Sequence, residues 1–267
     1  MRLDINCDLG EGFGNYRYGA DEEIAPYISS ANIACGYHAG DPAVMSRTVA
    51  LAKKHGVAVG AHPSFPDLLG FGRRELAATP AEVRDYVTYQ VGALWAFCRA
   101  HGVPLRHVKA HGAVYNMAAR DPQLATAVAE GVARVDPGLI FVGLASSCLI
   151  AAGHRAGLPT AAEAFADRAY NADGSLVSRR LPGAVINDPA AVAARVARMA
   201  REGLVEAVDG GEVRVDPDTV CVHGDTPGAA ELAKALRAGL AKEGVRVLAL
   251  TPDTLRPKAE LHRDQDT

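Results

Sequence analysis

Apolar and polar residues alternate along the first stretch of the chain, residues 4–9. The polar set is Asp4, Asn6 and Asp8, and the apolar set is Ile5, Cys7 and Leu9. Successive side chains of a β-strand point to opposite faces, so this pattern predicts a strand with one apolar and one polar face. Repeated helix-and-strand units follow it, which favours a buried parallel strand whose polar residues belong to a site. A half-exposed edge strand is the alternative.

The same pattern of helix starts and helix ends recurs along the chain. An N-cap residue followed by proline marks helix starts at Asp41-Pro42, Thr79-Pro80, Asp121-Pro122, Asp188-Pro189 and Thr226-Pro227. Glycine before an apolar run marks helix ends at Gly56, Gly102, Gly157, Gly203 and Gly244. The predicted strands cover residues 3–8, 29–35, 57–62, 106–111, 139–144, 159–165, 219–223 and 245–250. A hairpin is predicted within residues 205–215, around Asp209-Gly210-Gly211.

Strands that alternate with helices predict a parallel sheet covered by helices. Polar residues stand at most of the predicted strand ends, which favours a closed β/α barrel over an open sheet with a single crevice. A length of 267 residues suits one such domain. We therefore expect a single barrel over residues 1–255, and a charged, flexible tail over residues 256–267.

Composition and charge narrow the possible partners. A net charge of −3 lacks the basic excess that favours nucleic-acid binding, so no nucleic-acid partner is expected. The first residues contain no apolar leader and no run is long enough to span a membrane, which predicts a cytoplasmic protein. The five cysteines are dispersed and contain no Cys-x-x-Cys pair, so reduced, mostly buried thiols are expected.

Side chains that can perform chemistry gather at the predicted strand ends. They are Asn6, Asp8 and Glu11 on the first strand; Asn32 and His38 on the second; His62 and the loop with Arg73 on the third; His107, Lys109 and His111 on the fourth; Glu163 and Arg168 on the sixth; and His223 on the seventh. Any one of these histidines has a structural explanation. Their convergence at the carboxyl ends of parallel strands predicts a site with perturbed pKa values.

Several familiar motifs are missing from the sequence. It contains no phosphate-binding P-loop, no dinucleotide fingerprint, no nucleophile elbow and no His-Glu-x-x-His pair. A divalent metal held by Asp8, His38 and His62 is geometrically conceivable, although these spacings are not diagnostic. The metal content of the site stays open at this point.

Six segments, taken in order, resemble the LamB/YcsF family, the A subunits of bacterial 5-oxoprolinase. They are residues 4–11 (DINCDLGE), 31–41 (ANIACGYHAGD), 60–74 (GAHPSFPDLLGFGRR), 108–116 (VKAHGAVYN), 163–168 (EAFADR) and 222–225 (VHGD). The resemblance runs from about residue 3 to about residue 251. It implies a distorted β/α barrel of the glycoside hydrolase/deacetylase type. It also implies an enzyme that, with partner subunits B and C, opens 5-oxoproline to L-glutamate at the expense of ATP.

Residue types suggest roles within such a reaction. Lys109 and His223 would stabilise developing negative charge, His111 or Glu163 would transfer a proton, and Asp8 would orient water or a metal. Arg73 or Arg168 would bind the substrate carboxylate, and the remaining substrate-binding candidates are Asn6, Asn32, His38 and His62. Without a P-loop, ATP would bind either through unrecognised loops or at a site completed by a partner subunit.

Two other functions remain open. One is a metal-dependent deacetylase or amidohydrolase, which the barrel type alone suggests. The other is a non-catalytic subunit whose polar barrel mouth only captures a ligand.

Overall fold

Seven parallel strands close into a barrel in the computed structural model, which describes residues 1–178, 181–222, 224 and 228–255. The barrel strands are β1 (Arg2–Leu9), β2 (Ser30–Ala34), β3 (Ala58–His62), β4 (Leu105–Lys109), β5 (Ile140–Leu144), β6 (Thr160–Phe165) and β9 (Thr219–Val222). Each strand pairs with the next in this order, and β9 closes the ring by pairing in parallel with β1. The predicted β/α barrel is confirmed.

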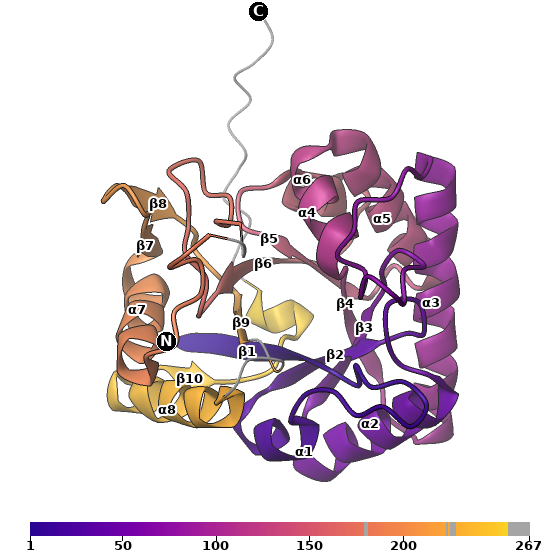
Figure 1. The fold of residues 1–267 in the computed structure, drawn as a ribbon, viewed down its shortest axis with the longest axis horizontal. Helices are drawn as coiled ribbons and strands as arrows, with labels where there is room; N and C mark the ends of the chain where they lie inside the picture. Colours follow the sequence, from indigo (N-terminus) through magenta and orange to yellow (C-terminus); the bar gives the residue numbers. More distant parts are fainter. Residues whose placement is uncertain (179–180, 223, 225–227, 256–267) are drawn as a thin grey trace, which may run out of the picture.

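Helices surround the strands (Figure 1). They are α1 (Asp21–Ile24), α2 (Pro42–His55), α3 (Pro80–Ala100), α4 (Gly112–Arg120), α5 (Pro122–Val135), α6 (Cys148–Arg155), α7 (Pro189–Glu202) and α8 (Ala229–Lys242), with 3-10 turns at Ala25–Tyr27 and Pro252–Thr254. The predicted N-caps Asp41, Thr79, Asp121 and Asp188 each accept backbone N–H bonds at a helix start. The predicted cap Thr226-Pro227 lies outside the described residues, as does the predicted tail. The predicted hairpin is present as β7 (Leu204–Glu206) paired with β8 (Glu212–Arg214).

The eighth predicted strand, residues 245–250, does not belong to the barrel. It contributes only β10 (Arg246–Val247), which pairs with Arg2 and Leu3 at the start of β1. Along Asp4–Cys7, β9 already occupies that edge of β1, since Asp4 lies opposite Thr219 and Cys7 opposite Val222. A strand has only two edges for hydrogen bonding, so the barrel closes without the last segment.

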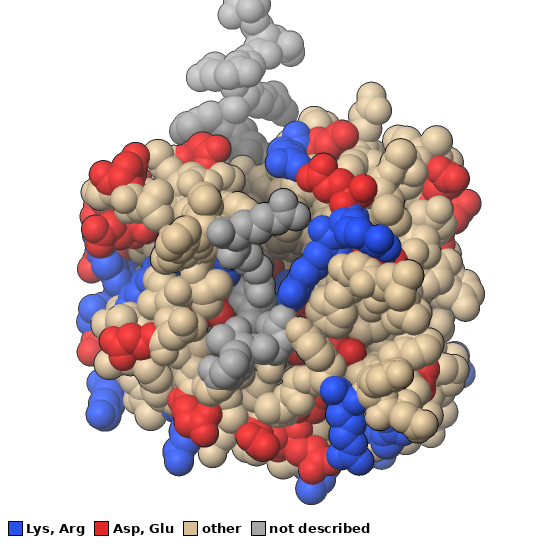
Figure 2. Space-filling model, viewed as in Figure 1, with Lys and Arg blue, Asp and Glu red and all other residues tan. Residues whose placement is uncertain are grey.

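Both faces of β1 are buried, which excludes the half-exposed edge strand. Ile5, Cys7 and Leu9 are at most 1% exposed and belong to the main hydrophobic core. Asp4 and Asn6, on the other face, are also buried and make hydrogen bonds with side chains of neighbouring strands. Figure 2 shows Lys and Arg interspersed with Asp and Glu over the viewed face of the molecule.

Asp4 lies buried near the start of β1, where hydroxyl groups surround its carboxylate. Ser29 and Ser30 each donate a hydrogen bond to Oδ1 at 2.7 Å, and Thr219 donates to Oδ2 at 2.5 Å. Burial raises the pKa of Asp4 to about 6, although these hydroxyl groups lower it in part. The folded protein therefore holds this proton more tightly than the unfolded chain does.

The replacement Asp4→Asn is expected to flatten the pH dependence of stability. In the wild type, the free energy of unfolding should fall as pH rises from about 4 to about 6, by roughly 3 kcal/mol for the Asp4 contribution. Urea unfolding at several pH values measures this slope. The pKa of Asp21 is also raised to about 6, so a smaller slope should remain. An unchanged slope in the variant would show that Asp4 does not titrate in this range.

Candidate active site

Lys109, at the end of β4, lies between two carboxylates from other strands. Its Nζ is 3.2 Å from Asp8 Oδ1 of β1 and 2.9 Å from Glu163 Oε1 of β6. The ammonium group also donates to Asn6 Oδ1 at 3.2 Å and to Cys221 Sγ at 3.1 Å. Three barrel strands therefore place one buried cation between two buried or nearly buried anions.

Two asparagines hold the Asp8 and Glu163 carboxylates in place. Asn32 donates from Nδ2 to Asp8 Oδ1 at 2.8 Å and to Asn6 Oδ1 at 2.7 Å. Asn6 in turn donates from Nδ2 to Glu163 Oε1 at 2.9 Å. Tyr115, one turn into α4, donates its hydroxyl to Glu163 Oε2 at 2.6 Å. Asn6 and Asn32 thus orient charged groups behind the pocket surface.

Mutual attraction keeps Lys109 and Asp8 ionised. Burial by itself lowers the pKa of Lys109, but attraction to Asp8 and Glu163 outweighs it and holds that pKa well above its usual value. Burial likewise raises the pKa of Asp8, but nearby His62 and Lys109 hold it well below its usual range. Lys109 is therefore an ammonium ion and Asp8 a carboxylate at neutral pH.

The second part of the site is a cluster of three histidines and Glu11. His62 at the end of β3 has its Nε2 3.2 Å from Asp8 Oδ2 and 3.0 Å from His111 Nδ1. The rings of His38 and His111 are stacked, with centroids 3.8 Å apart. One ligand atom from each of Glu11, His38, His62 and His111 can be chosen so that all lie within 4.8 Å of one another. This buried group could hold a metal ion.

The grouping differs from the metal set that the sequence made conceivable. Asp8, which the sequence offered as a conceivable metal ligand with His38 and His62, is not a member of this group, and its carboxylate contacts Lys109, Asn32 and His62. Glu11 and His111 join the two histidines instead. Glu11 follows β1 after Gly10, which has a left-handed φ of 70°, and this turn breaks the strand alternation that sequence reasoning relied on.

A pocket of about 470 Å³ opens beside both clusters. Six of the predicted site residues line it: Asp8, His62, Arg73, Lys109, His111 and Arg168. Four others, Asn6, Asn32, His38 and Glu163, are buried behind its wall, at 0 to 2% exposure. The remaining candidate, His223, lies outside the described residues. Tyr115 and Phe165 also line the pocket, and no sequence pattern had assigned either a role.

The two predicted substrate-binding arginines occupy different environments. Arg73 is exposed, and its guanidinium group lies 4.9 Å from the centre of the Phe71 ring. Arg168 is only 7% exposed, and its guanidinium group donates to the backbone carbonyls of Val177 and Ala184. Arg73 is therefore better placed to meet a ligand that enters from solvent.

His107 and four of the five cysteines are buried. His107 is buried and donates from Nε2 to Asn32 Oδ1 at 2.8 Å, and burial lowers its pKa to about 3. Gly60 makes room for it, because a Cβ there would lie 2.1 Å from His107 Nε2. All five cysteines are free thiols, four of them buried, as expected.

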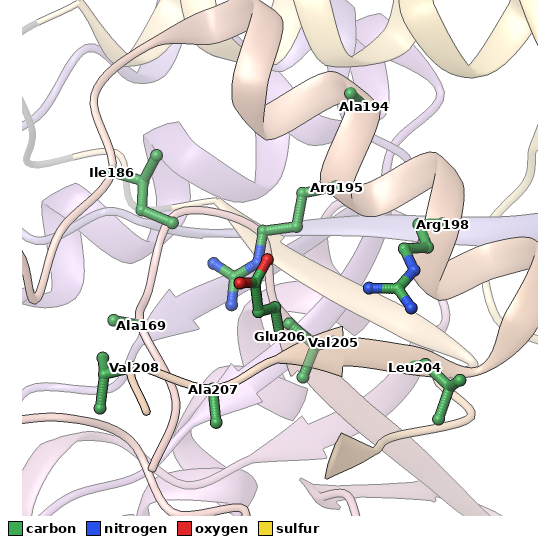
Figure 3. Close-up of a pocket in the computed structure, with 10 residues that line it drawn as sticks. All are labelled: Ala169, Ile186, Ala194, Arg195, Arg198, Leu204, Val205, Glu206, Ala207 and Val208. Atoms are coloured by element: carbon green, nitrogen blue, oxygen red, sulfur yellow. The ribbon is translucent and has the colours of Figure 1, made fainter. Parts of the chain in front are cut away.

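A second pocket, of about 430 Å³, lies between α7 and the β7–β8 hairpin (Figure 3). It contains none of the predicted site residues. Figure 3 shows Arg195 and Arg198 extending from α7 among mainly apolar lining residues. Arg195 donates to the carbonyl of Arg168, and Arg198 pairs with Glu202 and Glu212. These contacts give both arginines a structural role.

Within the described residues, none of the helices has the length and apolar character needed to cross a membrane.

Comparison with known proteins gives matches along nearly the whole chain. The sequence model of the LamB/YcsF family matches residues 3–254. The 5-oxoprolinase A subunit of Syntrophobacter fumaroxidans is 56% identical over 250 residues, which are 94% of this chain and 99% of that protein. The protein of the same name from Chloroflexus aggregans is 58% identical over 247 residues, 92% of this chain and 98% of that protein.

A solved structure agrees with these matches. The crystal structure of the lactam utilization protein from Thermus thermophilus is 52% identical in sequence and superimposes with a TM-score of 0.89. The alignment covers 94% of this chain and 100% of that chain.

Proposed function

The chain belongs to the LamB/YcsF family, and we propose that it is the A subunit of an ATP-dependent 5-oxoprolinase. In this proposal, it acts with subunits B and C to open the lactam of 5-oxoproline to L-glutamate, while ATP is hydrolysed to ADP and phosphate. The relatives named as 5-oxoprolinase A subunits support the substrate. The observation that carries the chemistry is the Lys109 ammonium ion beside the Asp8 carboxylate at the wall of the pocket.

Lactam opening needs both activation of the carbonyl group and a base. Amide resonance makes the lactam carbon a poor electrophile, and transfer of the ATP γ-phosphoryl group to the lactam oxygen would activate that carbon. Attack by water would give a tetrahedral intermediate whose ring C–N bond breaks as the nitrogen takes a proton, and a second water would hydrolyse the resulting acyl phosphate to glutamate and phosphate. Lys109, held as a cation, would stabilise the negative charge on the lactam oxygen and its phosphoryl group. Asp8 is 13% exposed and ionised, and would accept a proton from the attacking water.

The other residues would bind or position. Arg73, exposed beside the pocket, would bind the substrate carboxylate. Glu163 is fully buried, and both its oxygens are engaged by Lys109, Asn6 and Tyr115, so we assign it the positioning of Lys109 and not proton transfer. His111 has its ring nitrogens directed at Phe71 O and His62, which also favours Asp8 as the base. For His223, we keep the role suggested by its residue type, which is to stabilise developing negative charge together with Lys109.

The test is 5-oxoproline-dependent release of glutamate and ADP by the chain alone and by its mixture with subunits B and C. We expect activity only in the mixture. Asp8→Asn should lower kcat by about 10² to 10⁴ without preventing assembly, as size-exclusion chromatography can verify. Asp209→Asn, at the exposed hairpin turn, is the matched control and should keep full activity.

Three outcomes would count against the proposal. An assembled complex that releases no glutamate would leave this chain with a ligand-binding role only. Hydrolysis that proceeds without ATP would favour a metal-dependent amidohydrolase. Full activity of Asp8→Asn would remove Asp8 from the mechanism.

A further inference from the structure

We propose that Glu11, His38, His62 and His111 bind one divalent transition-metal ion of the Zn²⁺ class. All four side chains are at most 8% exposed, and they come from the loop after β1, the loop after β2, the end of β3 and the N-cap of α4. The inference rests on the geometry of these side chains and is independent of the proposed reaction.

Backbone carbonyls determine which nitrogen of two rings carries the proton. His62 Nδ1 is 2.7 Å from the carbonyl oxygen of Lys109, and His111 Nε2 is 2.9 Å from that of Phe71. A carbonyl oxygen can only accept, so each of these nitrogens donates an N–H. In the neutral rings, the lone pairs then lie on the other nitrogens, His62 Nε2 and His111 Nδ1.

Those two lone-pair nitrogens face each other at 3.0 Å. Two acceptors at this distance repel unless a cation lies between or beside them. A metal ion bound to both nitrogens removes the repulsion. The arrangement is also the usual one for metal-binding histidines, which donate their second ring N–H to a carbonyl or carboxylate that fixes the orientation of the ring.

Glu11 and His38 complete the donor set. Glu11 Oε1 lies 3.6 Å from His111 Nδ1 and 3.4 Å from His38 Nε2. His38 is 0% exposed, and neither of its ring nitrogens makes a hydrogen bond within the described part of the chain. A buried polar group without a hydrogen bond is costly, and coordination would give the His38 ring a bond that its 3.4 Å contact with Glu11 does not supply.

The separations of the donor atoms suit a small tetrahedral ion. Ligands at about 2.0–2.1 Å from a tetrahedral Zn²⁺ ion are about 3.3 Å from one another. Three of the six separations, 3.0, 3.4 and 3.6 Å, bracket that value, and the others are no larger than 4.8 Å, so the more distant ligands move closer on binding. The His38 and His111 rings are parallel within 3°, so an ion cannot lie in both ring planes. Binding therefore includes a rotation of one ring about its χ2 bond.

The donor types select the metal class. Three imidazole nitrogens and one carboxylate oxygen suit Zn²⁺, Co²⁺ and related ions, whereas Mg²⁺ and Ca²⁺ prefer oxygen ligands. A proton on His62 Nε2, shared between His111 Nδ1 at 3.0 Å and Asp8 Oδ2 at 3.2 Å, is the competing explanation of the short contact between the two histidines. The two explanations differ in a direct measurement, because only one predicts a bound ion.

The test uses the full chain, treated with a chelator, incubated with Zn²⁺ or Co²⁺ and then desalted. Elemental analysis should find about one ion per chain, and Zn²⁺ should raise the melting temperature while Mg²⁺ should not. Glu11→Gln and His38→Ala should each weaken Zn²⁺ binding by at least about 10-fold to 100-fold. His55→Ala, which removes an exposed histidine from α2, is the matched control and should bind normally.

Circular dichroism checks that each variant is folded. Glu11→Gln changes the shape of the side chain little, so it still tests the proposal if His38→Ala does not fold. Less than about a tenth of an ion per wild-type chain would overturn the proposal and favour the shared proton. Binding that both cluster variants retain in full would show an adventitious ion only, and would also overturn it.

Discussion

Replacing Lys109 with Met is expected to lower the free energy of unfolding by about 3 to 5 kcal/mol at neutral pH and to abolish turnover of the assembled enzyme. Methionine nearly fills the space of lysine but carries no charge. Asp8 and Glu163 would then be left in the barrel without the cation that lies 3.2 and 2.9 Å from them. Desolvated carboxylates without a partner account for the stability loss, and the missing ammonium group accounts for the loss of turnover.

The effect of Lys109→Met on stability should depend on pH in a defined direction. Without Lys109, the pKa of Asp8 in the folded state should rise, so protonation of Asp8 relieves the repulsion between the two carboxyl groups as pH falls. The difference in the free energy of unfolding between Lys109→Met and the wild type should therefore become smaller as pH falls from 7 to 5, as denaturant unfolding can measure. The double variant Lys109→Met/Glu163→Gln removes one of the two charges and should recover part of the loss.

Lys54→Met, at an exposed position near the end of α2, is the control for the loss of a lysine. It should change the free energy of unfolding by no more than about 0.5 kcal/mol. If Lys109→Met were as stable as this control, the buried ion pairs would have no role in the fold.

Replacing Gly72 with Ala is expected to destabilise the protein by about 3 to 4 kcal/mol and to disturb the histidine cluster. Gly72 has a left-handed φ of 64°, which alanine adopts at a cost. Its Cβ would also lie 2.2 Å from Ser64 Oγ, 2.8 Å from His38 Cβ and 2.9 Å from His111 Cδ2. Ser64, His38 and His111 would have to shift to admit the methyl group.

Gly14→Ala is a matched control, because Gly14 has a similar φ of 58° but no atom within 4 Å of the added Cβ. It should cost only about 1 kcal/mol, the backbone contribution alone. Denaturant unfolding of the two variants side by side therefore isolates the packing contribution near His38 and His111. Equal losses would mean that the loop adapts freely and that the rings are not tightly held.

Much of the fold follows from local rules in the sequence. Asp41, Thr79, Asp121 and Asp188 begin helices where the Asp/Thr-Pro pairs predicted them, because side-chain capping and the fixed φ of proline act within one turn. Seven strands lie near their expected places, because the residue pattern that predicts a strand is also local. The eighth predicted strand lies outside the barrel because β9, from another part of the chain, occupies the edge of β1 along Asp4–Cys7.

The sequence predicted which residues form the site but not how deeply each of them is buried. The rule that polar residues meet at the carboxyl ends of parallel strands brought Asp8, Lys109 and Glu163 together correctly. It could not tell that Asp8 reaches the pocket while Glu163 lies fully buried behind Lys109. Exposure depends on the layer of the barrel and on the covering loops, which periodicity does not encode.

By itself, the sequence of this protein determined the strand and helix order, the helix caps, the barrel class and the set of side chains able to perform chemistry. These depend on interactions within a few residues or on a period of two along a strand. Only the tertiary structure decided that Glu11, not Asp8, joins His38, His62 and His111, and that seven strands close the barrel. Both outcomes depend on distances between segments far apart in the chain, which packing of the whole barrel determines.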